Sequence, residues 1–187
     1  MNPDKMCDSL LQGMQEAQKN YFEMSNGWWL CSGAEYFLTS NLATHLHFTD
    51  PQRVFCTVEE SLQSFSFGRG RRNHALRMGG RADIAVWDGF ENPIGIVEVK
   101  VQKSVSTCGE DLDRLTTFAS KTLGLAAFVY YRSFSEPTPD RVAAMANRRL
   151  DSVSRSVNEY AEYCELSICS RNHISEAVDD RDMPKSW

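Results

Sequence analysis

The sequence predicts an α/β fold in which helices cover both faces of a mixed β-sheet. Three observations favour this class: two apolar runs flank a turn over 82–102, helical periodicity marks 3–24 and 139–163, and a helix pattern precedes an apolar run over 107–132. The 187 residues are 42% hydrophobic and 24% charged. These values are typical of one globular domain over 1–187, and its core is expected over about 26–134.

Two helices and one strand are expected in the N-terminal third. Apolar residues recur every three or four positions over 3–24, which indicates an amphipathic helix. This apolar stripe consists of Met6, Leu10, Met14, Ala17 and Tyr21. The pair Asn26-Gly27 separates the helix from a second one over 33–46. Apolar side chains then alternate over 53–58, which is a strand pattern.

A hairpin and a helix are expected in the middle of the chain. The segments 82–87 and 94–102 read as strands, and the residues of 88–93 supply the turn between them. The Thr-Cys-Gly-Glu sequence that opens 107–124 has the spacing of a helix capping box. A glycine at the end of that segment is well placed to end the helix.

The C-terminal third is expected to begin with a strand and continue as a long helix. The continuous apolar run over 125–132 predicts a strand buried on both faces. A proline at the first position favours a helix over 139–163. A short strand over 166–170 is possible by pattern, and the polar tail 176–187 is expected to fray.

The composition limits which partners and which cellular compartment we expect for this protein. The formal net charge is −5, so contact with nucleic acid would require a local basic patch. The chain does not begin like a signal peptide, and no apolar run approaches the ~20 residues of a membrane helix. The six cysteines lack metal-ligand spacing and are expected to be reduced and mostly buried. A cytoplasmic protein without membrane contact is therefore expected.

Charged side chains interrupt both strands of the expected hairpin. Glu98 and Lys100 share one face of their strand because strand side chains alternate, and the hairpin brings Asp83 opposite them. Two carboxylates suit a hard divalent cation such as Mg²⁺ or Mn²⁺, to which the Val99 carbonyl could add a ligand. The lysine can orient or deprotonate an attacking water, or stabilise developing negative charge.

Asp83 followed by Glu98-Val99-Lys100, in a strand–turn–strand context, resembles the PD-(D/E)xK nuclease superfamily. The resemblance implies a restriction-endonuclease-like αβββαβ core over 33–132, with additional N- and C-terminal helices. It implies a nuclease that hydrolyses phosphodiesters of nucleic acid, foremost DNA, with Mg²⁺ or Mn²⁺ on Asp83 and Glu98 and with Lys100 acting on the attacking water. Because family members commonly dimerise, a homodimer is expected by analogy.

The resemblance also implies auxiliary residues. Many members add a carboxylate from the first core helix, where Glu35 matches, and others place an acid at the end of the first strand, where Glu60 lies. Gln102 follows on the same strand face as the lysine and could reach the site. One departure is the absence of the family's proline before the first acid, since Arg81-Ala82 stands there.

An arginine-rich segment, 64–81, precedes the first acid of the motif, and no acid lies between Glu60 and Asp83. Its arginines are Arg69, Arg71, Arg72, Arg77 and Arg81. The guanidinium fork suits phosphate, and the glycines of the segment favour a loop that could close over a nucleic-acid backbone. The alternative is a solvated loop that pairs with the acidic surface.

A second hypothesis is of another class. The same fold could serve as a catalytically inactive binding or inhibitor module that acts on a protein or nucleic-acid partner, because no helicase, methylase or reader motif accompanies the site. Asp111, Asp113 and Arg114, on the helix after the site, are expected on its solvated face, from which Arg114 could still reach phosphate.

Overall fold

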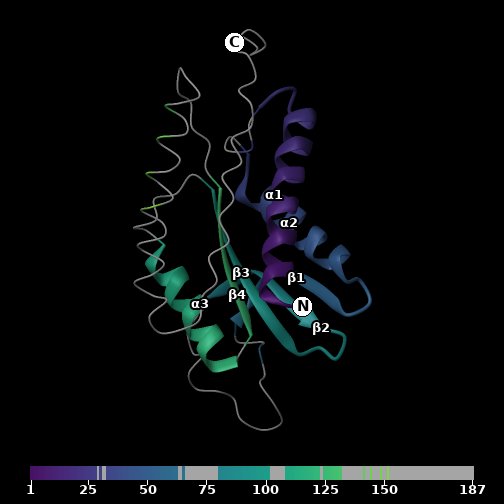
Figure 1. The fold of residues 1–187 in the computed structure, drawn as a ribbon, viewed down its shortest axis with the longest axis vertical. Helices are drawn as coiled ribbons and strands as arrows, with labels where there is room; N and C mark the ends of the chain where they lie inside the picture. Colours follow the sequence, from purple (N-terminus) through teal and green to yellow (C-terminus); the bar gives the residue numbers. More distant parts are fainter. Residues whose placement is uncertain are drawn as a thin grey trace.

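The fold is taken from a computed structural model of the chain (Figure 1). The residues that it describes are 1–28, 30, 33–62, 65, 80–101, 108–122, 124–131, 141, 144, 148 and 151. Within this part of the chain, no helix combines the length and the apolar character that crossing a membrane would need.

The described residues form three helices and a four-stranded mixed sheet, consistent with the predicted α/β class. The elements are α1 (Pro3–Met24), α2 (Glu35–Thr49), β1 (Val54–Ser61), β2 (Arg81–Asp88), β3 (Pro93–Val101), α3 (Gly109–Thr122) and β4 (Leu125–Tyr131). The sheet order is β1-β2-β3-β4; β1 and β3 pair antiparallel with β2, while β4 runs parallel to β3. A parallel neighbour requires a crossover, and α3 lies in that connection.

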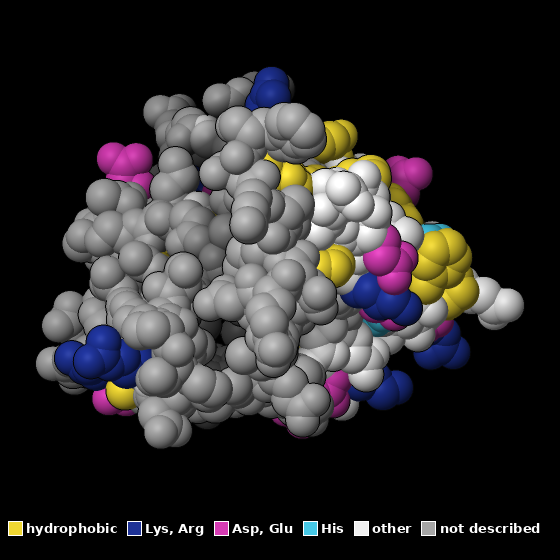
Figure 2. Space-filling model, turned by 90° about the horizontal axis from the view of Figure 1, so that it is seen from above, with side chains coloured by type: hydrophobic (Ala, Val, Ile, Leu, Met, Phe, Trp, Pro, Cys, Tyr) yellow, Lys and Arg dark blue, Asp and Glu magenta, His cyan; other side chains and the backbone are white. Residues whose placement is uncertain are grey.

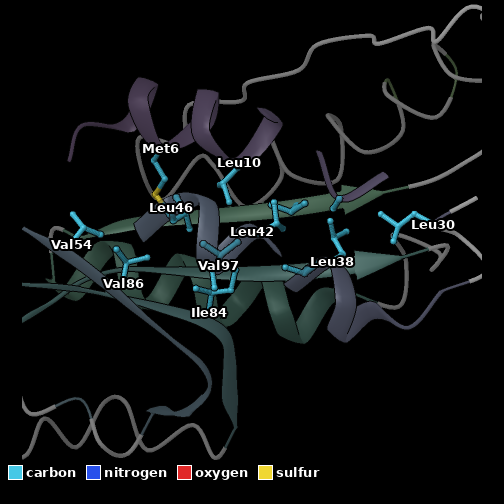
Figure 3. Close-up of a cluster of buried hydrophobic side chains, with 14 residues drawn as sticks. Met6, Leu10, Leu30, Leu38, Leu42, Leu46, Val54, Ile84, Val86 and Val97 are labelled. Atoms are coloured by element: carbon cyan, nitrogen blue, oxygen red, sulfur yellow. The ribbon is translucent and has the colours of Figure 1, made fainter. Parts of the chain in front are cut away.

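Helices α1 and α2 pack together over one face of the sheet (Figures 1 and 3). α1 begins after Asn2, whose side chain accepts the Lys5 N–H at 2.8 Å. Gly13 lets the helices approach closely, because a Cβ there would lie 3.0 Å from the Cβ of His45. The buried side chains of this layer include Met6, Leu10, Leu38, Leu42, Leu46, Val54, Ile84, Val86, Val97 and Val99.

Helix α3 covers the opposite face of the sheet, so the expectation of helices on both faces is confirmed. Phe118 is fully buried there and meets Phe65 edge-on, with 5.9 Å between the ring centroids. The other buried residues of this layer are Leu62, Ala82, Ala85, Ile96, Leu112 and Leu115. β3 therefore has a helical layer on each side, and its side chains alternate between the two.

The hairpin between β2 and β3 forms as expected, and its turn helps to fix the register of the two strands. The Asp88 carboxylate accepts the N–H groups of Phe90 at 2.8 Å and Asn92 at 2.9 Å, which closes the turn. The register shifts between Val86 and Trp87, and beyond this shift Ile84 pairs with Val97. A shift by one residue would turn every side chain to the other face, so this register decides which charged groups meet.

Three expectations about individual elements need correction. α2 runs from Glu35 to Thr49 rather than over 33–46, and β1 runs from Val54 to Ser61 rather than over 53–58. β4 forms as expected, but burial of both its faces was a wrong prediction, because Val129 is its one buried residue and the other six are partly exposed. β4 stands at the end of the strand order in the described sheet, where fewer neighbours cover it.

The helix expected over 139–163 lies largely outside the described residues. Those of its residues that the structure describes are helical and exposed; they are Arg141, Ala144, Arg148 and Asp151. The expected strand over 166–170 and the tail 176–187 lie outside the described residues altogether.

We expect Phe118→Ala to lower the free energy of unfolding by about 3–5 kcal/mol, because it removes a fully buried ring between α3 and the sheet. Urea denaturation followed by circular dichroism measures the change. Asp113→Ala, an exposed position on the same helix, should stay within about 0.5 kcal/mol of wild type. Equal losses of stability in the two variants would contradict this packing of α3.

Candidate functional site

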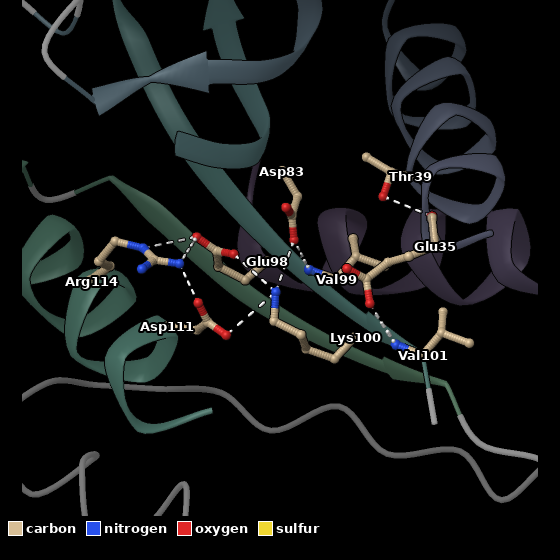
Figure 4. Close-up of polar contacts among 9 residues, drawn as sticks. All are labelled: Glu35, Thr39, Asp83, Glu98, Val99, Lys100, Val101, Asp111 and Arg114. Carbon is tan, nitrogen blue, oxygen red and sulfur yellow. Dashed lines mark hydrogen bonds and ion pairs between the residues drawn. The ribbon is translucent and has the colours of Figure 1, made fainter. Parts of the chain in front are cut away.

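Three charged side chains of the hairpin meet where β2 and β3 stop pairing (Figure 4). The Nζ of Lys100 lies 3.5 Å from Asp83 Oδ2 and 3.6 Å from Glu98 Oε2. The side chain of Glu98 is only 1% exposed, while those of Asp83 and Lys100 are 17% and 14% exposed. The structure thus brings together the three residues that the sequence motif singled out.

The end of the β2–β3 ladder explains the position of two carboxylates. Strand pairing stops at Ile84, and beyond it the Asp83 side chain accepts the N–H of Val99 at 2.6 Å. Glu35, at the first position of α2, accepts the next N–H on the same side of β3, that of Val101, at 3.1 Å. Both acids therefore satisfy backbone donors of β3 that a longer β2–β3 ladder would have paired.

Helix α3 contributes two further charged groups, Asp111 and Arg114, and their expected solvation was a wrong prediction. Asp111 Oδ2 lies 3.4 Å from the Nζ of Lys100. The Arg114 guanidinium donates to Glu98 Oε1 and also to Asp111 Oδ1. Both side chains are about 15% exposed, whereas Asp113 is exposed as expected.

The physical reason is the orientation of α3. Leu112, Leu115 and Phe118 form its buried stripe, and Asp111 and Arg114 border that stripe on the side facing Lys100 and Glu98. The spacing of three residues between Asp111 and Arg114 suits contact on one helix face and was the available sequence signal.

Burial and the opposite charges nearby act against each other on the pKa values of Glu98 and Lys100. Burial, with the Asp83 carboxylate adding to it, raises the pKa of Glu98 to about 8, although Arg114 and Lys100 act the other way. Burial also opposes the charge of Lys100, but the surrounding carboxylates, Asp83 first, outweigh it and raise the pKa of Lys100. The ammonium is therefore firmly protonated in this arrangement.

The donor set suits a hard cation. The side-chain oxygens of Asp83, Glu98 and Asp111 surround one ammonium nitrogen, which stands in for a cation among them. Glu98 Oε2 is buried and has no hydrogen-bond partner, although it faces that ammonium. Among the described residues, no group of three or more His, Cys, Asp or Glu side chains stands ready to hold a metal. A cation placed among these carboxylates would compete with the Lys100 ammonium for them.

Other expected site residues are placed only in part. Val99 has its N–H on the side of Asp83, and the carbonyl of a strand residue points to the same side as its N–H. Glu60 lies on β1 opposite Ala82, one position from Asp83 in the β2 sequence. Gln102 lies outside the described residues.

Of the five arginines expected to contact phosphate, the structure describes one. Arg81 is exposed at the start of β2, two residues before Asp83. The others, Arg69, Arg71, Arg72 and Arg77, lie outside the described residues. On the face shown in Figure 2, the basic and acidic side chains of the described residues are interspersed rather than gathered by sign. The phosphate-binding prediction therefore depends on the arginine-rich segment itself.

Comparisons of the chain with protein-family models, with curated proteins and with solved structures found no match.

We expect the metal-free protein to lose stability as the pH rises from roughly 4.3 to about 8. Folded Glu98 holds its proton more tightly than the unfolded chain does, so deprotonation favours unfolding throughout this window. The contribution of this one group has a slope of at most about 1.4 kcal/mol per pH unit.

Urea unfolding of wild type and Glu98→Gln, with chelator present, measures this contribution. The stability of wild type relative to Glu98→Gln should fall across the window and level off above it, because glutamine does not titrate. Parallel pH profiles for the two proteins would contradict the raised pKa of Glu98.

Proposed function

We propose that this chain is a metal-dependent nuclease of the PD-(D/E)xK type that hydrolyses nucleic-acid phosphodiesters, with DNA as the first substrate to test. One observation carries the proposal: Asp83 and Glu98 converge on Lys100 at the end of the β2–β3 ladder. The carboxylates come from adjacent strands and the lysine follows Glu98 by two residues on the same strand face, as the motif requires.

The order of elements supports the same proposal at the level of the fold. From α2 to β4 the chain runs helix, three strands, helix, strand, and the last strand is parallel to the third. This is the αβββαβ order of a restriction-endonuclease-like core, with α1 as an addition that packs beside α2. Fold alone does not establish an activity, so the charged cluster carries the functional argument.

Asp83 and Glu98 would hold Mg²⁺ or Mn²⁺, and Glu98 would do so through Oε2, which has no hydrogen-bond partner. The Val99 carbonyl and the Glu35 carboxylate are further oxygen donors near these two residues. When bound, the metal would supply an activated water and neutralise charge on the phosphodiester. Acidic side chains outnumber basic ones in this cluster, as a site for a cation requires. The acids are Asp83, Glu98, Asp111 and Glu35, and the cations are Lys100 and Arg114.

Lys100 would act as a charged donor in this reaction. In the metal-free protein the carboxylates outweigh burial and raise the pKa of Lys100, so in that state it is poorly suited to remove a proton from water. An ammonium can instead orient the attacking water and stabilise negative charge that develops on the phosphate. Of the three roles that the sequence left open, the metal-free arrangement favours these two over removal of a proton.

A second candidate, the catalytically inactive module, is favoured by a different observation. Arg114 already pairs with Glu98 Oε1, and the Lys100 ammonium already pairs with Glu98 Oε2 and with Asp111. The charged groups of the cluster can therefore balance one another without a metal. In such a module the cluster would join β3 to α3 and bind no metal. A partner protein or nucleic acid would then be held by another surface.

We expect cleavage of DNA in Mg²⁺ or Mn²⁺, and a loss of at least about 100-fold in Asp83→Asn, Glu98→Gln and Lys100→Met, because each variant loses a group to which the proposal assigns metal binding or the stabilisation of developing charge. The assay uses plasmid, linear, single-stranded and branched DNA. Asp113→Asn is the matched control on α3 and should cleave like wild type. Cleavage that survives in Lys100→Met and Asp83→Asn would rule out this site, and no cleavage by wild type would favour the inactive module.

For the arginine-rich segment, we expect Arg71→Ala combined with Arg72→Ala to weaken DNA binding. The slope of log affinity against log salt should fall by about 1 for each phosphate that the double variant no longer neutralises. Fluorescence anisotropy in Ca²⁺, over a series of salt concentrations, measures the slope. Arg53→Ala is the control, because Arg53 is exposed at the far end of the sheet, next to the residue that pairs with Asp88. Identical slopes for the double variant and wild type would favour a solvated loop.

A further inference from the structure

We propose that Arg114, held in place by Asp111, is a positioning residue that aims one oxygen of Glu98 at the site. The inference rests on the proposed function, because the oxygen in question is the one that would bind the metal. It assigns a role to two residues of α3 that stand outside the motif of Asp83, Glu98 and Lys100.

The two oxygens of Glu98 have different surroundings. Arg114 donates from Nε at 3.2 Å and from Nη2 at 3.1 Å, and both bonds go to Oε1. Oε2 receives no hydrogen bond and lies 3.6 Å from the Nζ of Lys100. The guanidinium therefore fixes the plane of the carboxylate, with one oxygen committed to α3 and the other directed to the cluster (Figure 4).

The position of the guanidinium is itself constrained from two sides. Asp111, three residues earlier on α3, accepts from the same Nη2 that bonds Glu98. On another side the chain passes close to the arginine at Gly80, where a Cβ would lie 3.4 Å from Arg114 Cδ. With 14% of its side chain exposed, Arg114 has little freedom to leave Glu98. Partners of this kind orient the ligands of metal sites.

Charge alone predicts a different behaviour. Arg114 and Lys100 are both cations beside Glu98, so simple repulsion predicts that removing either of them strengthens the binding of a divalent cation. The positioning role predicts opposite signs. Loss of Lys100 removes the group that stands in the cation's place, whereas loss of Arg114 frees the Glu98 carboxylate to rotate.

The test is the Mn²⁺ affinity of the whole chain, measured by titration calorimetry without nucleic acid. Arg114→Met should weaken Mn²⁺ binding by about 10- to 100-fold, the usual cost of losing a partner of a metal ligand. Arg114→Lys, which keeps one donor for Oε1, should bind with intermediate affinity. Lys100→Met should bind Mn²⁺ more tightly than wild type, and Asp113→Asn should bind it equally well. Metal-free thermal unfolding checks that each variant is folded, and Arg114→Gln replaces the methionine variant if that one is not.

Three outcomes would overturn the inference. If Arg114→Met binds Mn²⁺ as tightly as wild type or more tightly, charge repulsion alone explains the effect of Arg114. If Arg114→Lys binds Mn²⁺ no more tightly than Arg114→Met, Arg114 does not position Glu98. In both cases wild type still binds Mn²⁺, and the proposed function stands. A wild-type chain that binds no Mn²⁺ would overturn the proposed function and this inference together, so the two failures are told apart by the wild-type titration.

Discussion

The early end of the β2–β3 ladder is the constraint on which the site depends. Once pairing stops at Ile84 and Val97, the N–H groups of Val99 and Val101 need other acceptors. Side-chain carboxylates take that role, Asp83 from β2 and Glu35 from the first position of α2. Negative charge is therefore concentrated at one strand end by the need to satisfy the backbone, and that concentration is what draws the Lys100 ammonium into the cluster.

Glu98 ties this strand end to the helix behind it. Its side chain enters the layer between the sheet and α3, where a lone carboxylate would be costly, and Arg114 and Lys100 offset part of that cost. Glu98 Oε1 accepts two hydrogen bonds from Arg114, whereas Oε2 accepts none. The proposed metal site depends on this difference between the two oxygens of one buried acid.

The sequence predicted those parts of the fold and site that depend on local pattern. The period of two on β3, with the turn at Asp88, was enough to place Asp83 beside Glu98. The position of Arg114 was not predictable in this way, because a charged residue at the border of an apolar helix stripe looks solvated until its partner, sixteen residues earlier on another element, is known. For the same reason the apolar run of β4 predicted a strand but not its place at the end of the described strand order.

The most direct test of whether this cluster exchanges the Lys100 ammonium for a divalent cation is a crystal structure of the chain grown with Mn²⁺ and measured for anomalous scattering. We predict an anomalous peak between the carboxylates of Asp83 and Glu98, with the Nζ of Lys100 displaced from its present position. A structure without such a peak, in which the ammonium still lies among the carboxylates of Asp83, Glu98 and Asp111, would contradict the exchange.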